Sequence, residues 1–168
     1  MTILVTGAAG FIGSNFVLDW FEEYDEDIIS LDKLTYAGNP ENLKSLENNK
    51  NHIFVKGDIA DEKLITSILN EYQPRAIINF AAESHVDRSI HGPKDFIDTN
   101  IIGTYSLLEM TRIFWNNLGY KPKNIFRFLH VSTDEVYGSL ENNEPPFSEM
   151  TPYAPSSPYS ASKAASDH

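Results

Sequence analysis

The sequence of 168 residues contains no cysteine. Disulfide bonds, thiolate metal sites and a cysteine nucleophile are therefore excluded, and the chain is compatible with a reducing compartment. Long apolar stretches are also missing, because runs such as 76–80 fall far short of the roughly 20 residues of a membrane span. The first seven residues carry no basic residue before their short apolar run, unlike a signal peptide. We therefore expect a cytoplasmic protein that does not enter a membrane.

Positive charge is scarce as well. Lys and Arg number 13 against 24 Asp and Glu, which gives a formal net charge of −11. Such a balance disfavours sequence-independent binding of nucleic acid and attachment to an anionic membrane surface, since both need cationic side chains. Hydrophobic residues, at 41%, are sufficient for a packed core, and the length fits one ordinary domain.

Short β-branched runs alternate with longer amphipathic segments along the chain. Near-continuous apolar strands separated by helices are typical of a parallel sheet covered on both faces, so the pattern predicts an α/β, Rossmann-type doubly wound fold. The expected strands are 2–6, 28–31, 52–56, 76–80 and 126–132. The expected helices are 10–24, 61–72, 93–118 and 159–168, and the proline-rich segment 138–158 is expected to form a long surface loop.

The predicted helix 93–118 carries two apolar rows about a quarter turn apart. The first row is Ile97, Ile101, Leu108 and Trp115, and the second is Leu107, Met110, Phe114 and Leu118. One row would cover the sheet. The other either faces a second subunit or belongs, with the first, to a single broad buried face.

A glycine-rich turn joins the first predicted strand to the first predicted helix. Gly7, Gly10 and Gly13 have the spacing that lets a backbone turn tightly and approach a pyrophosphate at a helix N-terminus. Asp32 ends the next strand, 19 positions after Gly13, where an acidic residue accepts hydrogen bonds from a ribose and repels a 2′-phosphate. The combination predicts an NAD site, the alternative being a structural turn with a solvated aspartate.

Two further strand ends are expected at the same site, because ligands of open α/β sheets bind beyond the carboxyl ends of the strands. Asp58, between Gly57 and Ile59, is placed to accept a hydrogen bond from an adenine amino group, or else forms a turn or caps a helix. The small residues Ala81 and Ala82, with Glu83 and Ser84 after them, would let the backbone run beside the cofactor.

Tyr159 and Lys163 are four positions apart in the last predicted helix, so they project from one face. Pro158 suits the first turn of that helix, and Ser156 or Ser157 could cap it. A nearby ammonium and a nicotinamide cation favour the phenolate of a tyrosine, which can then accept a proton from a hydroxyl group. Taken alone, the two residues could be an exposed helix pair without function, but the glycine-rich turn earlier in the chain disfavours that alternative.

Thr133, Asp134 and Glu135 follow the fifth predicted strand at its carboxyl end. Neighbouring carboxylates in a semi-enclosed site can divide into one acid and one base, although such a pair can also lie in a solvated turn. No metal-ligand spacing is present around His85. Arg88 could meet a phosphate or a structural carboxylate, and the sequence does not decide between them.

Together these residues resemble the extended short-chain dehydrogenase/reductase superfamily and, within it, the nucleotide-sugar 4,6-dehydratases. The matching stretches are 6–14, 32–39, 81–89, 132–138 and 155–163. The resemblance implies an NAD-dependent hydro-lyase that converts dTDP-glucose to dTDP-4-keto-6-deoxyglucose for rhamnose or other deoxysugar synthesis. It also implies a homodimer.

The resemblance gives roles to matching positions. Tyr159 would deprotonate the glucose C4 hydroxyl, Lys163 would lower the pKa of that tyrosine and hold the nicotinamide ribose, and Thr133 would orient the C4 oxygen. Glu135 would remove the C5 proton, and Asp134 would protonate the departing C6 hydroxyl. Ser84 would touch the substrate. The implied cofactor contacts are Gly7, Gly10, Phe11, Ile12, Gly13, Asp32, Lys33, Leu34, Thr35, Asp58, Ile59, Ala81, Ala82, Glu83, Thr99, Tyr159 and Lys163.

The end of the sequence gives a further expectation. Residues 159–168 have helical composition but no C-cap signal, so we expect an NAD-binding domain over 1–168, cut within its last helix. The substrate-binding portion of the family would then lie outside this chain, and the chain alone would not turn over substrate. Two other functions remain open, namely a related epimerase or decarboxylase, disfavoured by Asp134 and Glu135, and a non-catalytic NAD-binding module.

Overall fold

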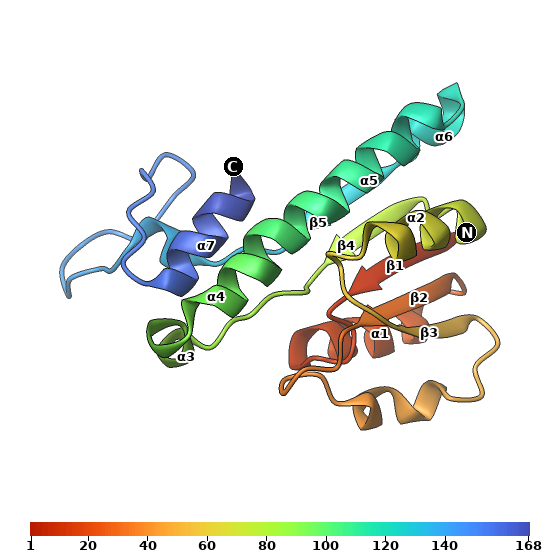
Figure 1. Cartoon of the computed structure of the whole chain (residues 1–168), viewed down its shortest axis with the longest axis horizontal. Helices are drawn as coiled ribbons and strands as arrows, with labels where there is room; N and C mark the ends of the chain where they lie inside the picture. Colours follow the sequence, from red (N-terminus) through yellow and green to blue (C-terminus); the bar gives the residue numbers. More distant parts are fainter.

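The computed structural model describes residues 1–168, and a five-stranded parallel sheet lies at its centre (Figure 1). The strands have the order β3-β2-β1-β4-β5. Their bounds are β1 Thr2–Thr6, β2 Asp27–Asp32, β3 His52–Lys56, β4 Ala76–Asn79 and β5 Arg127–His130. The order reverses direction between β1 and β4, and such a switch point is where open α/β sheets bind ligands.

Helices cover both faces of the sheet, which confirms the doubly wound α/β prediction. Ile3 and Val5 of β1 pack on one face with Val17, and Leu4 packs on the other with Leu107. The long helices are α1 Phe11–Glu23, α2 Glu62–Tyr72, α5 Thr104–Asn117 and α7 Pro158–Asp167. The shorter ones are η1 Pro40–Leu46, α3 Val86–His91, α4 Pro93–Phe96, η2 Ile97–Gly103, α6 Tyr120–Ile125 and η3 Asp134–Tyr137.

The strand predictions for 2–6 and 52–56 are confirmed to the residue, whereas the predictions for 76–80 and 126–132 were too long. These two apolar runs extend beyond the hydrogen-bonded residues of the strands because their last residues, such as Phe80 and Val131, line the cleft above the sheet. Four short helices, α3, α6, η1 and η3, were not predicted. Each is too short to show a helical repeat in its side chains.

The prediction of one continuous α-helix over 93–118 is wrong in its middle. A π-helix, η2, separates α4 from α5, so the hydrogen-bonding pattern changes twice along one rod-like segment. Of the two apolar rows, the second covers the sheet through Leu107 and Phe114. The first row is not part of a single broad buried face, since Leu108 and Trp115 are exposed.

The proline-rich segment 138–158 is an irregular loop that leads into α7, as predicted. Its start is tied back to its end, because the amide of Ala154 donates to the carbonyl of Val136 over 2.9 Å. The ring of Tyr137 lies 5.5 Å from that of Phe147 and 5.3 Å from that of Tyr153, which gives the loop its own aromatic cluster. None of the helices has both the length and the apolar character that a membrane crossing requires.

Candidate functional site

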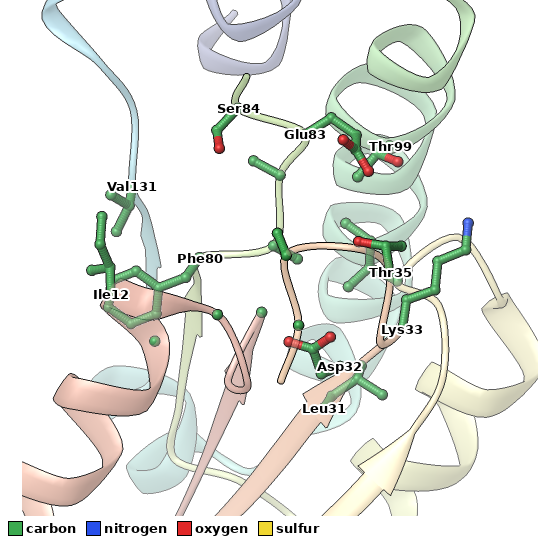
Figure 2. A pocket seen from close by; sticks show the side chains of 18 of the residues that line it. Ile12, Leu31, Asp32, Lys33, Thr35, Phe80, Glu83, Ser84, Thr99 and Val131 are labelled. Atoms are coloured by element: carbon green, nitrogen blue, oxygen red, sulfur yellow. The ribbon is translucent and has the colours of Figure 1, made fainter. Parts of the chain in front are cut away.

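A cleft of about 400 Å³ opens beyond the carboxyl ends of the strands, where the sequence argument placed the site (Figure 2). Most of the predicted residues line it. They are Gly7, Gly10, Phe11, Ile12, Gly13, Asp32, Lys33, Thr35, Asp58, Ile59, Ala81, Ala82, Glu83, Ser84, Thr99, Tyr159 and Lys163. Four predicted residues do not line it: Leu34, Thr133, Asp134 and Glu135.

The glycine turn forms the floor of the cleft and leaves no room for side chains. Gly7 has a φ of +65°, and a Cβ there would lie 2.6 Å from the amide nitrogen of Ala81. A Cβ on Gly13 would lie 2.2 Å from the carbonyl oxygen of Gly7. Helix α1 starts directly after Gly10, its N-cap residue. Because glycine has no side chain, the first amides of the helix have no side-chain hydrogen-bond partner there. The free amides and the close backbone fit a pyrophosphate group.

Asp32 lies at the end of β2 (Figure 2), and two backbone amides hold its carboxylate in one orientation. One oxygen accepts from the amide of Ala9 over 2.9 Å, and the other accepts from the amide of Leu34 over 2.7 Å. Leu34 has a φ of +56°, an unusual conformation for leucine, so the chain turns sharply to make this contact. A carboxylate oxygen accepts more than one hydrogen bond, and the fixed group can therefore still receive ribose hydroxyls.

Asp58 lines the cleft, yet its carboxylate already has two partners. One oxygen accepts from the amide of Ala60 over 2.9 Å, and the other lies 2.6 Å from the ammonium of Lys33. That ion pair raises the pKa of Lys33. The turn-forming alternative for Asp58 is thus present in the structure, and Asp61, three residues later, is the cap of α2.

Asn100, a residue that the sequence argument missed, ties the cleft to α7. It is 1% exposed, and its side chain both accepts from the amide of Glu83 and donates to the carbonyl of Glu83. The same amide group donates to the hydroxyl of Ser162 over 2.9 Å. Its position inside the π-helix gave no sequence signal, because neither its neighbours nor its spacing distinguish it from a helix surface residue.

Helix α7 places the buried side chains of Tyr159 and Lys163 in the lining of the cleft. The predicted N-terminal signals are confirmed: Pro158 occupies the first turn, and Ser157 forms a capping box with Ser160. The ammonium of Lys163 donates to the carbonyl of Val131 over 2.7 Å, which fastens the helix to the end of β5.

Burial is the largest cause of the pKa shift of each member of this pair. The pKa of Tyr159 is raised, first because burial disfavours the phenolate, while hydrogen bonding with Thr133 lowers it and the charges of Glu135 and Asp134 raise it. Burial lowers the pKa of Lys163, and Asp167 opposes that shift. In this structure the ammonium of Lys163 bonds the carbonyl of Val131 and is not among the groups that shift the pKa of Tyr159, so its expected role stays a prediction.

Thr133, Asp134 and Glu135 lie next to Tyr159 but outside the cleft itself. The charges of both acids act on the phenol of Tyr159, and Thr133 is within hydrogen-bonding reach of it. The hydroxyl of Thr133 caps η3 by accepting from the amide of Glu135 over 3.3 Å. Asp134 and Glu135 are both exposed.

Several lining residues were missed. Leu31 and Phe80 were overlooked because they precede the motifs that drew attention at each strand end. The full set of lining residues that were missed is Leu31, Ala37, Gly38, Phe80, Val131 and Ser132, whereas Gly57, expected beside Asp58, does line the cleft.

Arg88, whose partner the sequence left open, contacts an aromatic ring. The guanidinium carbon of Arg88 lies 3.6 Å above the ring centre of Tyr36, so in this structure it meets an aromatic face.

Comparison with known proteins agrees with this geometry. Residues 4–168 match the family model described as GDP-mannose 4,6 dehydratase. The dTDP-glucose 4,6-dehydratase of Xanthomonas campestris pv. campestris is 61% identical over 167 residues, which are 99% of this chain and 47% of that protein. This chain thus spans about half the length of the curated relatives that it matches.

Solved structures give the same result. The dTDP-glucose 4,6-dehydratase of Bacillus anthracis, solved in complex with NAD, has a TM-score of 0.84 and 46% identity, with coverage of 99% of this chain and 48% of that one. The UDP-glucose 4-epimerase of Thermotoga maritima, solved with UDP-glucose, has a TM-score of 0.82 and 33% identity, with coverage of 99% and 49%. The fold is shared with both, and the identity is higher to the dehydratase.

Proposed function

Because the chain belongs to the GDP-mannose 4,6 dehydratase family, we propose that it forms the NAD-binding part of an enzyme that dehydrates dTDP-glucose to dTDP-4-keto-6-deoxyglucose. One observation carries the proposal: a tyrosine that lines the cleft together with a lysine lies next to an aspartate–glutamate pair. The relatives of highest identity are named dTDP-glucose 4,6-dehydratases, which supports this substrate.

The glycine turn and Asp32 would hold the cofactor. At Gly7 and Gly13 the backbone lies so close to neighbouring backbone that no side chain fits, which leaves the turn open to a phosphate group. The free amides at the start of α1 would donate hydrogen bonds to that phosphate. Asp32 would receive the ribose hydroxyls, and its negative charge would exclude a 2′-phosphate, which favours NAD over NADP. When bound, NAD supplies a hydride acceptor that is regenerated within one turnover.

The chain's own side chains would move the protons. Tyr159 takes the proton of the C4 hydroxyl, and Thr133 orients that oxygen. The ketone formed at C4 acidifies the proton at C5, which Glu135 removes. Asp134 protonates the C6 hydroxyl so that it departs as water. The hydride given up by C4 to the bound NAD would be returned to C6, and a proton would return to C5, so that the net change is the loss of one water molecule.

The raised pKa of Tyr159 sets a requirement for this chemistry. In the structure burial and two carboxylates oppose the phenolate. A cation placed beside the ring would reverse that balance, since an opposite charge favours the ionised form. The ammonium of Lys163, in reach of the same cleft, is the group on this chain that could do so after leaving the carbonyl of Val131.

The exposed apolar row on the long helix supports a second subunit as partner. Ile97, Leu108 and Trp115 are 48%, 41% and 38% exposed on one side of the rod formed by α4, η2 and α5. Large exposed apolar side chains in one row are typical of an interface between subunits. We include a homodimer and a cytoplasmic location in the proposal; a monomer in analytical ultracentrifugation of the protein at its native length would remove the first.

Replacing Glu135 with glutamine in the protein at its native length tests the function. We expect C4 oxidation without elimination, so that reduced nicotinamide accumulates and is read by its ultraviolet absorbance. Glu141→Gln, an exposed carboxylate in the loop 138–158, is the matched control and should turn over normally. An epimerase would keep its activity in the Glu135 variant, and a binding module would make no product in any form.

A further inference from the structure

A buried chain of hydrogen bonds begins at the cofactor cleft and runs under the strand ends. The amide of Ala81, a cleft residue, donates to the hydroxyl of Thr6 over 3.3 Å. The hydroxyl of Thr6 donates in turn to the side-chain oxygen of Asn79 over 2.5 Å. Thr6 and Asn79 are 0% and 1% exposed, so no water replaces these partners. The first half of this series of hydrogen bonds therefore crosses from β1 to β4.

The second half runs from β4 through β5 to the catalytic helix. The side-chain nitrogen of Asn79 lies 3.0 Å from Nδ1 of His130, and Nε2 of His130 lies 3.1 Å from the hydroxyl of Ser166. The hydroxyl of Ser166 donates to the backbone carbonyl of Lys163 over 2.8 Å. The chain thus ends on the residue whose ammonium reaches the cleft.

The groups in this series of hydrogen bonds are compatible with only one assignment of donors and acceptors. The oxygen of Asn79 is taken by Thr6, so its NH₂ group faces His130, and Nδ1 of His130 must be the bare acceptor. Nε2 then carries the only ring proton and donates to Ser166. Ser166 has its own proton committed to the carbonyl of Lys163, so its oxygen is free to accept. The geometry fixes His130 as a neutral ring with one tautomer.

We propose that His130 is a positioning residue for the reaction: its neutral Nε2–H tautomer locks α7, and with it Tyr159 and Lys163, to the strand ends that carry the cofactor. This inference rests on the proposed function, because the two residues being positioned matter only if they act on a bound sugar. It concerns a residue that touches neither cleft nor substrate, since His130 does not line the cleft.

Protonation of His130 would break the chain. A second ring proton, on Nδ1, would point at the NH₂ group of Asn79, donor against donor. The titratable groups facing the ring come from α7 alone and are Lys163 and Asp167, while β4 and β1 contribute the uncharged Asn79 and Thr6. Burial and Lys163 lower the pKa of His130, and Asp167, 3.6 Å away, opposes them. The lock therefore holds at neutral pH and opens in acid.

The pH profile of kcat tests the proposal in the protein at its native length. With the wild type we expect kcat to fall as the pH drops below the ordinary histidine value of 6.5. His130→Gln, which keeps a donor near the Nε2 position and cannot titrate, should lose that acid limb and retain most of its activity at neutral pH. His130→Asn, which cannot reach Ser166, should lose about tenfold in kcat with little change in KM.

A matched control separates this role from general stability. His52 is also half-buried in the sheet, bonds Ser30 over 2.9 Å and has a pKa lowered by burial, but it lies on β3, far from α7. His52→Gln should leave the acid limb of kcat in place. A His130→Gln profile that keeps the wild-type acid limb, or an equal change in both variants, would overturn the proposal.

An NMR measurement that does not depend on turnover tests the tautomer of His130 directly. The ¹⁵N chemical shifts of His130 distinguish the two neutral tautomers, and we expect a protonated Nε2 and an unprotonated Nδ1 at neutral pH. The opposite tautomer, or a charged ring at neutral pH, would refute the lock even if no variant folds. If the unaltered protein shows this tautomer but neither binds NAD nor makes product, the proposed function fails and the positioning role falls with it.

Discussion

Replacing Gly13 with alanine perturbs the cofactor cradle at its tightest point. A Cβ there would lie 2.2 Å from the carbonyl oxygen of Gly7, whereas Cβ contacts below 3.0 Å essentially do not occur. The turn and the start of α1 must therefore separate by at least about 0.8 Å. Overpacking of this kind costs about 1–3 kcal/mol of folding free energy. A displaced amide would also lose its hydrogen bond to a phosphate, and a bond to a charged group contributes about 1.5–3 kcal/mol, or roughly 10- to 100-fold in affinity.

Isothermal titration with NAD and urea unfolding measure these two effects separately. Gly119→Ala is the matched control, because a Cβ at that position meets nothing within 4 Å, and it should bind and unfold as the wild type does. Gly10→Ala, whose Cβ would lie 3.3 Å from the same carbonyl of Gly7, should fall between the two. Unchanged NAD affinity in a folded Gly13→Ala protein would refute the close-approach argument for this turn.

The remaining predictions concern α7 and the residues that directly precede β2 and β4. Ser157→Ala removes the capping box of α7 and should lower the free energy of unfolding, measured by urea unfolding, by about 1 kcal/mol. Ser157→Asp, which retains a capping oxygen, should keep most of the wild-type stability. The guanidinium of Arg75, 2.9 Å from the carboxylate of Glu26, lowers the pKa of that carboxyl, so the pair stabilises the fold above pH 4.5 and its contribution disappears as the pH falls through the lowered value. Arg75→Gln should therefore lower the free energy of unfolding at pH 7 but not at strongly acid pH; an equal difference at both would contradict the ion pair.

The sequence was sufficient for the parts of the site that local chemistry determines. The spacing of Gly7, Gly10 and Gly13 predicts the turn because only glycine tolerates backbone approaches as close as those observed. Asp32 was predicted from its place at a strand end, and parallel strands necessarily bring their carboxyl ends to one edge. The sequence offered Ser156 or Ser157, followed by Pro158, as the start of α7, and Ser157 is the residue that caps it.

What the sequence did not predict depends on contacts between distant segments. Asn100 was missed because its partners, Glu83 and Ser162, come from other elements and create no pattern around it. The raised pKa of Tyr159 was not anticipated because its largest cause is burial, which the sequence does not report, and the charges of Glu135 and Asp134 add to it. His130 was overlooked for the same reason, since its environment is formed by β4 and α7 together.

The π-helix between α4 and α5 has a consequence for how this protein tolerates changes in length. Each residue of an α-helix turns the chain by roughly 100°. A π-turn holds one residue more than an α-turn, so deleting a single residue from 97–103 would restore a regular spiral and leave α4 and α5 facing close to their present directions. Asn100, inside the altered turn, would shift away from Glu83 and Ser162, while the sheet-covering side of α5 stayed where it is. A surface loop absorbs such a deletion without consequence; in this rod the extra residue places Asn100 against its partners, and its presence is as strict a requirement as the identity of any glycine in the turn.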